Sequence, residues 1–225
     1  MMPVHRGSAA LAAACLAGSL GACTTPPTRV YSLEAVAPAA GPASADGTDA
    51  PAGAPIRVDA VSVPPALDRS EIVSDEPLGR LRIHDLDHWP APLGEAARQT
   101  LSADLDSRLA PGRLIFPHLP KPPGALGLSV DILSFHLDQG IARLEASWVI
   151  SGPDLGSLRR TVTLRRVAWT TPPAAPTGTA TLAAPDAAAT ASALGNLLAD
   201  LADLIAASLT PADLRNSAAA TGSEP

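Results

Sequence analysis

The feature that most constrains the fold is a run of alternating apolar and polar residues from Leu128 to Trp169. Alternation with a period of two is typical of a β-strand that has one buried face. Two turn sequences, Asp138-Gln139-Gly140 and Gly152-Pro153-Asp154, divide the run into three strands. The apolar parity changes near Ile132, which predicts a β-bulge in the first strand. The run therefore predicts an antiparallel meander.

Two further segments have the periodicity of amphipathic helices. Leucine and alanine recur every three or four residues from Leu93 to Leu109, and again from Asp186 to Leu209, where Asp186 is a candidate N-cap. Shorter strand patterns occur at 29–34, 56–63, the end of 67–73, 80–83 and 113–116. Such elements, each apolar on one side, predict a two-layer α+β fold, with a mostly antiparallel sheet and both helices packed on one face.

The first 22 residues have the layout of a secretory signal peptide. A short cationic start with Arg6 precedes an apolar run from Ser8 to Leu20, which is too short to span a bilayer. Leu20-Gly21-Ala22-Cys23 resembles the bacterial lipobox, in which the cysteine receives a diacylglycerol, the signal is removed and the new N-terminus is acylated. The alternative is an ordinary cleaved signal followed by an unmodified cysteine. Thr24 stands where an Asp would favour inner-membrane retention, so we expect the outer membrane.

These features divide the chain into four parts. We expect a signal peptide at 1–22, a lipidated N-terminus with a short strand and a flexible linker at 23–55, an α+β domain at 56–210 and a disordered tail at 211–225. Because Cys15 leaves with the signal and Cys23 carries lipid, we expect no free thiol and no disulfide. The formal net charge of -6 argues against nucleic acid as a partner.

Several landmarks occur in the order found in the PqiC/YmbA-type lipoproteins, which are also called the ABC-type transport auxiliary lipoprotein family. The segment from Leu67 to Val73 is similar to the family's "yLdRpqIV" segment, and the segment from His88 to Leu93 to its "RWaePL" entry to the first helix. Further on, the segment from Val130 to Phe135 resembles "vdIlrF", and the segment from Leu144 to Trp148 resembles "L.a.W". The resemblance extends roughly from Tyr31 to Leu209.

This resemblance implies a non-enzymatic periplasmic lipoprotein that is anchored in the outer membrane through Cys23 and needs no cofactor. It also implies an MCE-domain protein and an inner-membrane permease as partners, in a system that moves lipids between the two membranes and supports envelope integrity. Members of the family can assemble as rings, so the resemblance also implies a homo-oligomeric ring for this chain. The alternative is a lipoprotein plug or assembly factor for an outer-membrane β-barrel protein.

Few patterns suggest chemistry of the chain's own. The sequence has no G-x-S-x-G, no P-loop and no G-x-G-x-x-G, so we expect no catalytic residue and assign nucleotide hydrolysis to a partner. The cluster His84-Asp85-Leu86-Asp87-His88 has residue types that bind metals, but Ile83 and Pro90 indicate strand and loop rather than helix. We therefore expect a solvated loop without a metal.

Three residues are candidates for contact with a partner or with a neighbouring subunit of a ring. Asp68 and Arg69 form a charged pair in a loop, for which the alternative is a structural turn. Trp89 is flanked by prolines at the entry to a helix, for which the alternative is a place in the core. We assign Trp148, which lies in the middle strand of the meander, to the core.

Four arginines occur on the last strand of the meander, two on each of its faces. They either contact phospholipid head groups or an acidic partner, or they protect an edge strand by charge, as many proteins do. These four residues are Arg159, Arg160, Arg165 and Arg166.

Overall fold

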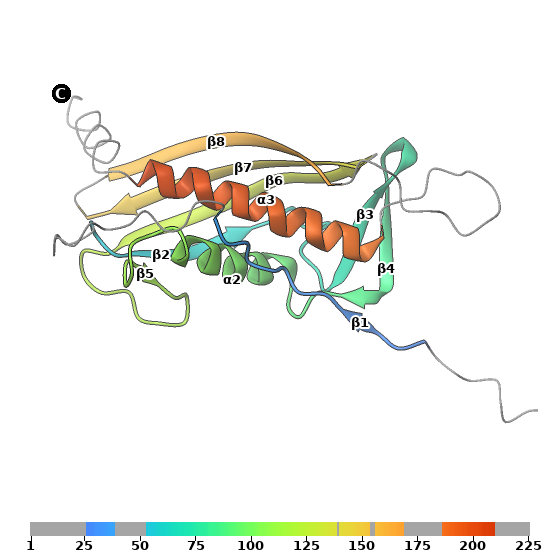
Figure 1. Cartoon of the computed structure of the whole chain (residues 1–225), viewed down its shortest axis with the longest axis horizontal. Helices are drawn as coiled ribbons and strands as arrows, with labels where there is room; N and C mark the ends of the chain where they lie inside the picture. The colour runs from blue at the N-terminus through green and yellow to red at the C-terminus, as the bar shows by residue number, and fades with distance from the viewer. Residues whose placement is uncertain (1–25, 39–52, 139, 154–155, 169–185, 210–225) are drawn as a thin grey trace, which may run out of the picture.

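The computed structural model describes residues 26–38, 53–138, 140–153, 156–168 and 186–209. Cys23, the leader and the tail at 211–225 lie outside these residues. The described residues form two helices and two mixed sheets, one of three strands and one of five (Figure 1). The predicted α+β class is therefore confirmed, and the strands are divided between two sheets.

The larger sheet has the strand order β5-β2-β6-β7-β8. The predicted meander is confirmed, since β6, β7 and β8 are antiparallel neighbours, and the register shifts between Ile132 and Ser134 as the parity change indicated. Strand β2 pairs in parallel with both β5 and β6, which makes the sheet mixed. The strands are β5 (Leu114–Ile115), β2 (Ile56–Ser62), β6 (Leu126–Asp138), β7 (Ile141–Gly152) and β8 (Gly156–Val167).

The smaller sheet has the order β1-β4-β3. Strands β3 (Glu71–Glu76) and β4 (Arg80–His88) form an antiparallel hairpin around the 3-10 turn η2 (Pro77–Gly79). Strand β1 (Arg29–Val30) pairs in parallel with the end of β4. The hairpin contacts the end of β6 through Asp75, which accepts hydrogen bonds from that strand.

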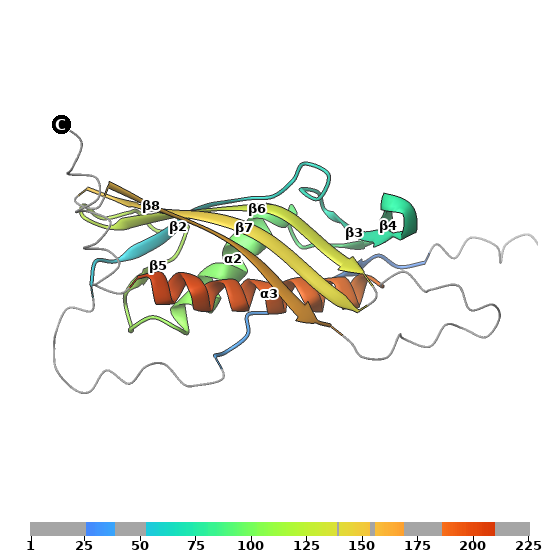
Figure 2. The same cartoon turned by 90° about the horizontal axis from the view of Figure 1, so that it is seen from above.

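Both helices cover one face of the larger sheet, as predicted (Figures 1 and 2). They are α2 (Leu93–Asp106) and α3 (Ala187–Ser208). The Asp186 side chain accepts a hydrogen bond from the Ala189 amide at 2.7 Å, which confirms the predicted N-cap. Among the described residues, α3 is the one helix long and apolar enough to cross a membrane, but most of it is buried in the fold, which is typical of a core helix.

The hydrophobic core lies between the helices and the larger sheet. Trp148 on β7 is 4% exposed, which confirms its assignment to the core. Burying one large aliphatic side chain contributes about 1.5–3 kcal/mol, so this layer supplies most of the driving force for folding. Its largest fully buried side chains include Leu101, Leu105, Leu128, Leu144, Ile150, Leu194, Leu197, Leu198 and Leu201.

Candidate functional site at the N-terminal strap

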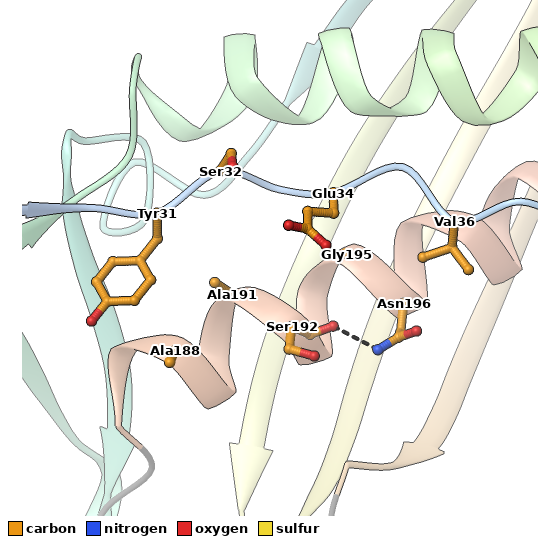
Figure 3. Close-up of a pocket in the computed structure, with 9 residues that line it drawn as sticks. All are labelled: Tyr31, Ser32, Glu34, Val36, Ala188, Ala191, Ser192, Gly195 and Asn196. Carbon is orange, nitrogen blue, oxygen red and sulfur yellow. Dashed lines mark hydrogen bonds between the residues drawn. The ribbon is translucent and has the colours of Figure 1, made fainter.

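An extended segment of residues 31–36, here called the strap, runs between α2 and α3 on the side away from the sheet (Figures 2 and 3). The pattern at 29–34 predicts a short edge strand, but only Arg29 and Val30 pair as one. Beyond them the strap leaves the sheet because its Leu33 side chain is buried among the helices. The segment closest to the proposed anchor is thus part of the folded core.

Side chains of α2 bind the strap backbone in place of a neighbouring strand. Thr100 Oγ1 donates to the Leu33 carbonyl at 2.9 Å. The Val36 amide donates to Asp104 Oδ1 at 2.7 Å, and Arg108 Nη1 donates to the Val36 carbonyl at 3.0 Å. Two successive turns of α2, and Arg108 just beyond its C-terminus, therefore fix the strap, although the strap and the helix are far apart in sequence.

Asp104 is the buried charge of this arrangement. Its side chain is fully buried, and its Oδ2 has no hydrogen-bond partner among the described residues. Burial raises the pKa of Asp104 to about 6, against the opposing effects of the Val36 amide and the Arg108 guanidinium. Arg108 also donates from Nε to Asp203 Oδ1 on α3 at 2.6 Å, so one arginine joins both helices and the strap.

A groove of about 390 Å³ lies between the strap and α3 (Figure 3). A Cβ atom at Gly195 would lie 3.3 Å from the Glu34 carbonyl oxygen, so the missing side chain allows the strap to approach α3 closely. The described residues that line the groove include no histidine, cysteine or cation, and so provide no acid-base pair. They are Tyr31, Ser32, Glu34, Val36, Ala188, Ala191, Ser192, Gly195 and Asn196.

The smaller sheet contains a serine, a histidine and an aspartate in a line that the sequence motifs did not reveal. Ser74 Oγ lies 2.8 Å from His84 Nε2, and His84 Nδ1 lies 3.7 Å from Asp87 Oδ2. Burial lowers the pKa of His84, which favours its neutral form. Ser74 and His84 come from the two strands of a hairpin, β3 and β4, rather than from a G-x-S-x-G turn, so motif searches do not find them.

This line of residues joins strands and does not have the features of a catalytic triad. Ser74 and Asp87 are each 4% exposed, so the hydroxyl is not accessible to a substrate. Asp87 accepts from Arg29 through both carboxylate oxygens, and is therefore held by β1 rather than by the histidine. The arrangement links β1, β4 and β3 in one polar network.

The three candidate contact residues lie around the N-terminus of α2. Asp68 Oδ1 accepts from the Gly94 amide at 3.1 Å, which satisfies one of the free donors at that helix end. Arg69 Nε donates to Glu71 Oε2 at 2.9 Å. The Trp89 side chain is 4% exposed and belongs to the core, so its ring offers little surface to a partner in this conformation. A contact through Asp68 and Arg69 stays a prediction.

The two histidines of the predicted loop lie in and at the end of β4. His84 contacts Ser74, and His88 Nε2 lies 2.9 Å from the Asp85 carbonyl oxygen. Within the described part of the chain, no group of three or more His, Cys, Asp and Glu side chains could hold a metal ion. The cluster belongs to a strand because β4 pairs with both β3 and β1 along this stretch.

The arginine-rich strand β8 is an edge of the larger sheet that the described residues form. On the side of the helices, Arg166 Nη1 binds Asp200 Oδ1 of α3 at 2.7 Å. On the open face, Arg165 lies directly opposite Arg143 of β7. The strand therefore uses its arginines in two ways, one of which leaves like charges side by side.

Comparisons with known proteins place these features in a wider context. A family described as "ABC-type transport auxiliary lipoprotein component" matches residues 31–206. A crystal structure of an uncharacterized protein has a TM-score of 0.61 and 17% identity, over 82% of this chain and 100% of that one. A protein from Xanthomonas campestris assigned to DUF330 has a TM-score of 0.54 and 14% identity, over 80% of this chain and 93% of that one. No match was found among curated proteins.

Proposed function

The chain belongs to the ABC-type transport auxiliary lipoprotein components, and from this membership we propose that it is an accessory subunit of an MCE/ABC-type intermembrane lipid transport system. The observation that carries the proposal is the family match over residues 31–206, which begins at the strap and ends within α3. The match thus includes every described strand except β1, helix α2, most of α3 and the contacts between strap and helices. The role proposed is support of transport and of envelope integrity.

We propose Cys23 as the lipidation site and the outer membrane as the location, with the folded domain facing the periplasm. A cysteine that carries two or three acyl chains is a stable anchor, whereas one chain gives only marginal binding. Thr24 in place of an Asp supports the outer membrane. Cys23 precedes Arg29, the first residue paired in a sheet, by six positions, so the proposed anchor is joined to the fold by a short segment.

The proposed role is that of a docking subunit without catalysis, in contact with an MCE-domain protein and acting with an inner-membrane permease. The buried Ser74 and the lack of a histidine, cysteine or cation among the described residues of the groove support this, and the absence of a P-loop from the sequence assigns ATP hydrolysis to another component. Asp68 and Arg69 are the proposed contacts to the partner or within a homo-oligomeric ring, and the backbone amide of the buried Trp89 donates a hydrogen bond to the carbonyl of the adjacent Ser70.

The test is co-purification from detergent-solubilised envelopes. We expect the full-length protein to recover the MCE-domain protein and the permease. A Cys23→Ser variant should lose its sedimentation with outer membranes, because it lacks the lipid. Recovery of a β-barrel protein alone would support the plug or assembly role instead, and unchanged sedimentation of Cys23→Ser would reject the proposed anchor.

A further inference from the structure

The tip of the β3–β4 hairpin presents apolar side chains to solvent. Leu78 is 98% exposed, and Leu81 and Ile83 of β4 are 49% and 43% exposed. Leu78 also has a φ of 68°, a left-handed conformation that glycine or asparagine adopts with less strain. A leucine at this position is unfavourable in water for both reasons, so its side chain is better explained by an apolar surface that covers it.

Two arginines, Arg143 and Arg165, here called the cationic row, lie next to this hairpin on the open face of the larger sheet. Arg143 of β7 lies opposite His136 of β6 on one side and opposite Arg165 of β8 on the other. Like charges directly opposite each other in a sheet repel. Among the described residues, no ion pair involves Arg143 or Arg165. An anionic surface would relieve this repulsion.

Contacts in the structure hold the hairpin next to the cationic row. Leu81 pairs with Asp75 across the hairpin. Asp75 in turn lies 3.2 Å from His136 Nδ1 and accepts from the Leu137 amide at 2.9 Å. Since His136 lies directly opposite Arg143, the hairpin is fixed to the sheet beside the cationic row.

This surface lies at the end of the molecule from which the N-terminal chain leaves. Figures 1 and 2 both show the hairpin tip and the start of β1 at the same end of the long axis, where β6 and β8 also end. From Cys23 to Arg29, the first residue paired in a sheet, the chain can span at most about 22 Å, because each residue extends no more than about 3.6 Å. A lipid on Cys23 would therefore hold this end of the fold close to a membrane.

We propose that the hairpin tip and the cationic row form a second membrane contact, in which Leu78, Leu81 and Ile83 enter the interfacial region and the arginines bind lipid phosphates. The proposal rests on the proposed lipid anchor at Cys23. Apolar side chains with adjacent cations are the combination that binds anionic bilayer surfaces. A projecting tip at the same end of the long axis as β1 suits a deformable lipid surface, which needs no preformed cavity.

The experiment uses the full-length lipidated protein in vesicles of phosphatidylethanolamine and phosphatidylglycerol. A Leu78→Cys variant would be labelled with an environment-sensitive fluorophore, the only free thiol if Cys23 is acylated. We expect a blue-shifted emission and strong quenching by head-group nitroxide lipids. The matched control is Ser157→Cys, an exposed position at the opposite end of β8, where we expect no quenching.

A second variant tests the cationic row. Replacing both arginines, Arg143→Gln with Arg165→Gln, should reduce the quenching at position 78 several-fold in vesicles with phosphatidylglycerol and leave it unchanged in vesicles of zwitterionic lipid alone. Equal quenching at positions 78 and 157 would overturn the proposal. A blue shift that needs added transport partners, without nitroxide quenching, would also overturn it and identify a protein contact.

The outcome is separable from the proposed function. Labelling of Cys23 itself in the parent protein, detected by mass, would remove the anchor and with it the premise. If the parent protein is acylated and recovers its transport partners while position 78 stays unquenched, only the second membrane contact is rejected.

Discussion

Arg29 binds Asp87 through both carboxylate oxygens, with Nε 2.6 Å from Oδ1 and Nη2 2.9 Å from Oδ2. The arginine is mostly exposed on β1, whereas the aspartate is buried on β4 and also lies near His84. Two parallel hydrogen bonds of this kind fix geometry better than a single contact does. This pair is the principal side-chain link between the start of the described chain and the smaller sheet.

Replacing Asp87 by alanine should lower the free energy of unfolding by about 1–3 kcal/mol, because a buried network loses its acceptor. Urea unfolding of the chain produced from residue 24, without leader or lipid, measures this. The matched control is Asp85→Ala, an exposed carboxylate two residues away on the same strand, for which we expect a change within about 0.5 kcal/mol. Equal effects at the two positions would contradict the assigned role of the pair.

The stability should depend on pH through Asp104. Its pKa is raised from 3.8 to about 6 by burial, so the folded chain holds this proton more tightly than the unfolded chain. Its stabilising contribution is therefore complete below pH 4 and is lost as the pH rises through 6, by about 2–3 kcal/mol in all. The stability of an Asp104→Asn variant should not show this dependence on pH, because asparagine does not titrate.

The measurement for Asp104 is the difference in unfolding free energy between the parent chain and Asp104→Asn from pH 4 to 7.5. The difference is needed because three other groups have the opposite sign. The pKa of His84 is lowered by burial, that of Glu71 is lowered to about 2 by the hydrogen bond from Arg69, and that of Glu95 is lowered by the hydrogen bond from Gln99, so all three lose stabilising effect as the pH falls. A difference that does not vary with pH would show that Asp104 does not titrate in this range.

Gly195 should control the attachment of the strap. Leucine at this position would place its side chain against the Glu34 carbonyl and displace residues 33–36, while the helix itself tolerates leucine well. We expect faster hydrogen exchange at the Val36 amide in Gly195→Leu. In Gly195→Ala the single Cβ lies 3.3 Å from that oxygen and needs a shift of only a few tenths of an ångström. Similar exchange in both variants would argue against this close approach.

Substitutions of Trp89 should lower the stability of the fold rather than act directly on partner binding. Trp89→Ala removes a core side chain and should cost about 3–5 kcal/mol, whereas Trp89→Phe should cost less because it retains an aromatic ring in the cavity. Thermal and urea unfolding measure both. Loss of partner binding in a Trp89→Phe variant that stays fully folded would instead indicate that the ring takes part in the contact.

Local patterns predicted the elements that depend on nearby residues. The bulge after Ile132, the meander and the Asp186 cap each follow from residues within a few positions of one another. The division into two sheets does not, because alternation identifies a strand and not its neighbour. The parallel pairing of β2 with β6 joins segments separated by more than 60 residues, and no local signal specifies it.

The candidate site shows the same limit. The Val36 amide binds Asp104 across 68 positions, and Asp68 binds the Gly94 amide across 26. In the sequence, Asp104 looks like one of several acids on the polar side of a helix, whereas the structure buries it because the strap covers that side. The Ser74 and His84 contact was missed for a related reason, since a hairpin brings them together without a recognised motif.

The route of the chain out of the fold has a mechanical consequence. A pull on the N-terminus would act first on β1, through its pairing with β4 and the two bonds between Arg29 and Asp87. Only after these broke would the tension reach Leu33 and the bonds from α2. A force on the N-terminus would therefore disrupt β1 before it reached the hydrophobic core between the helices and the larger sheet.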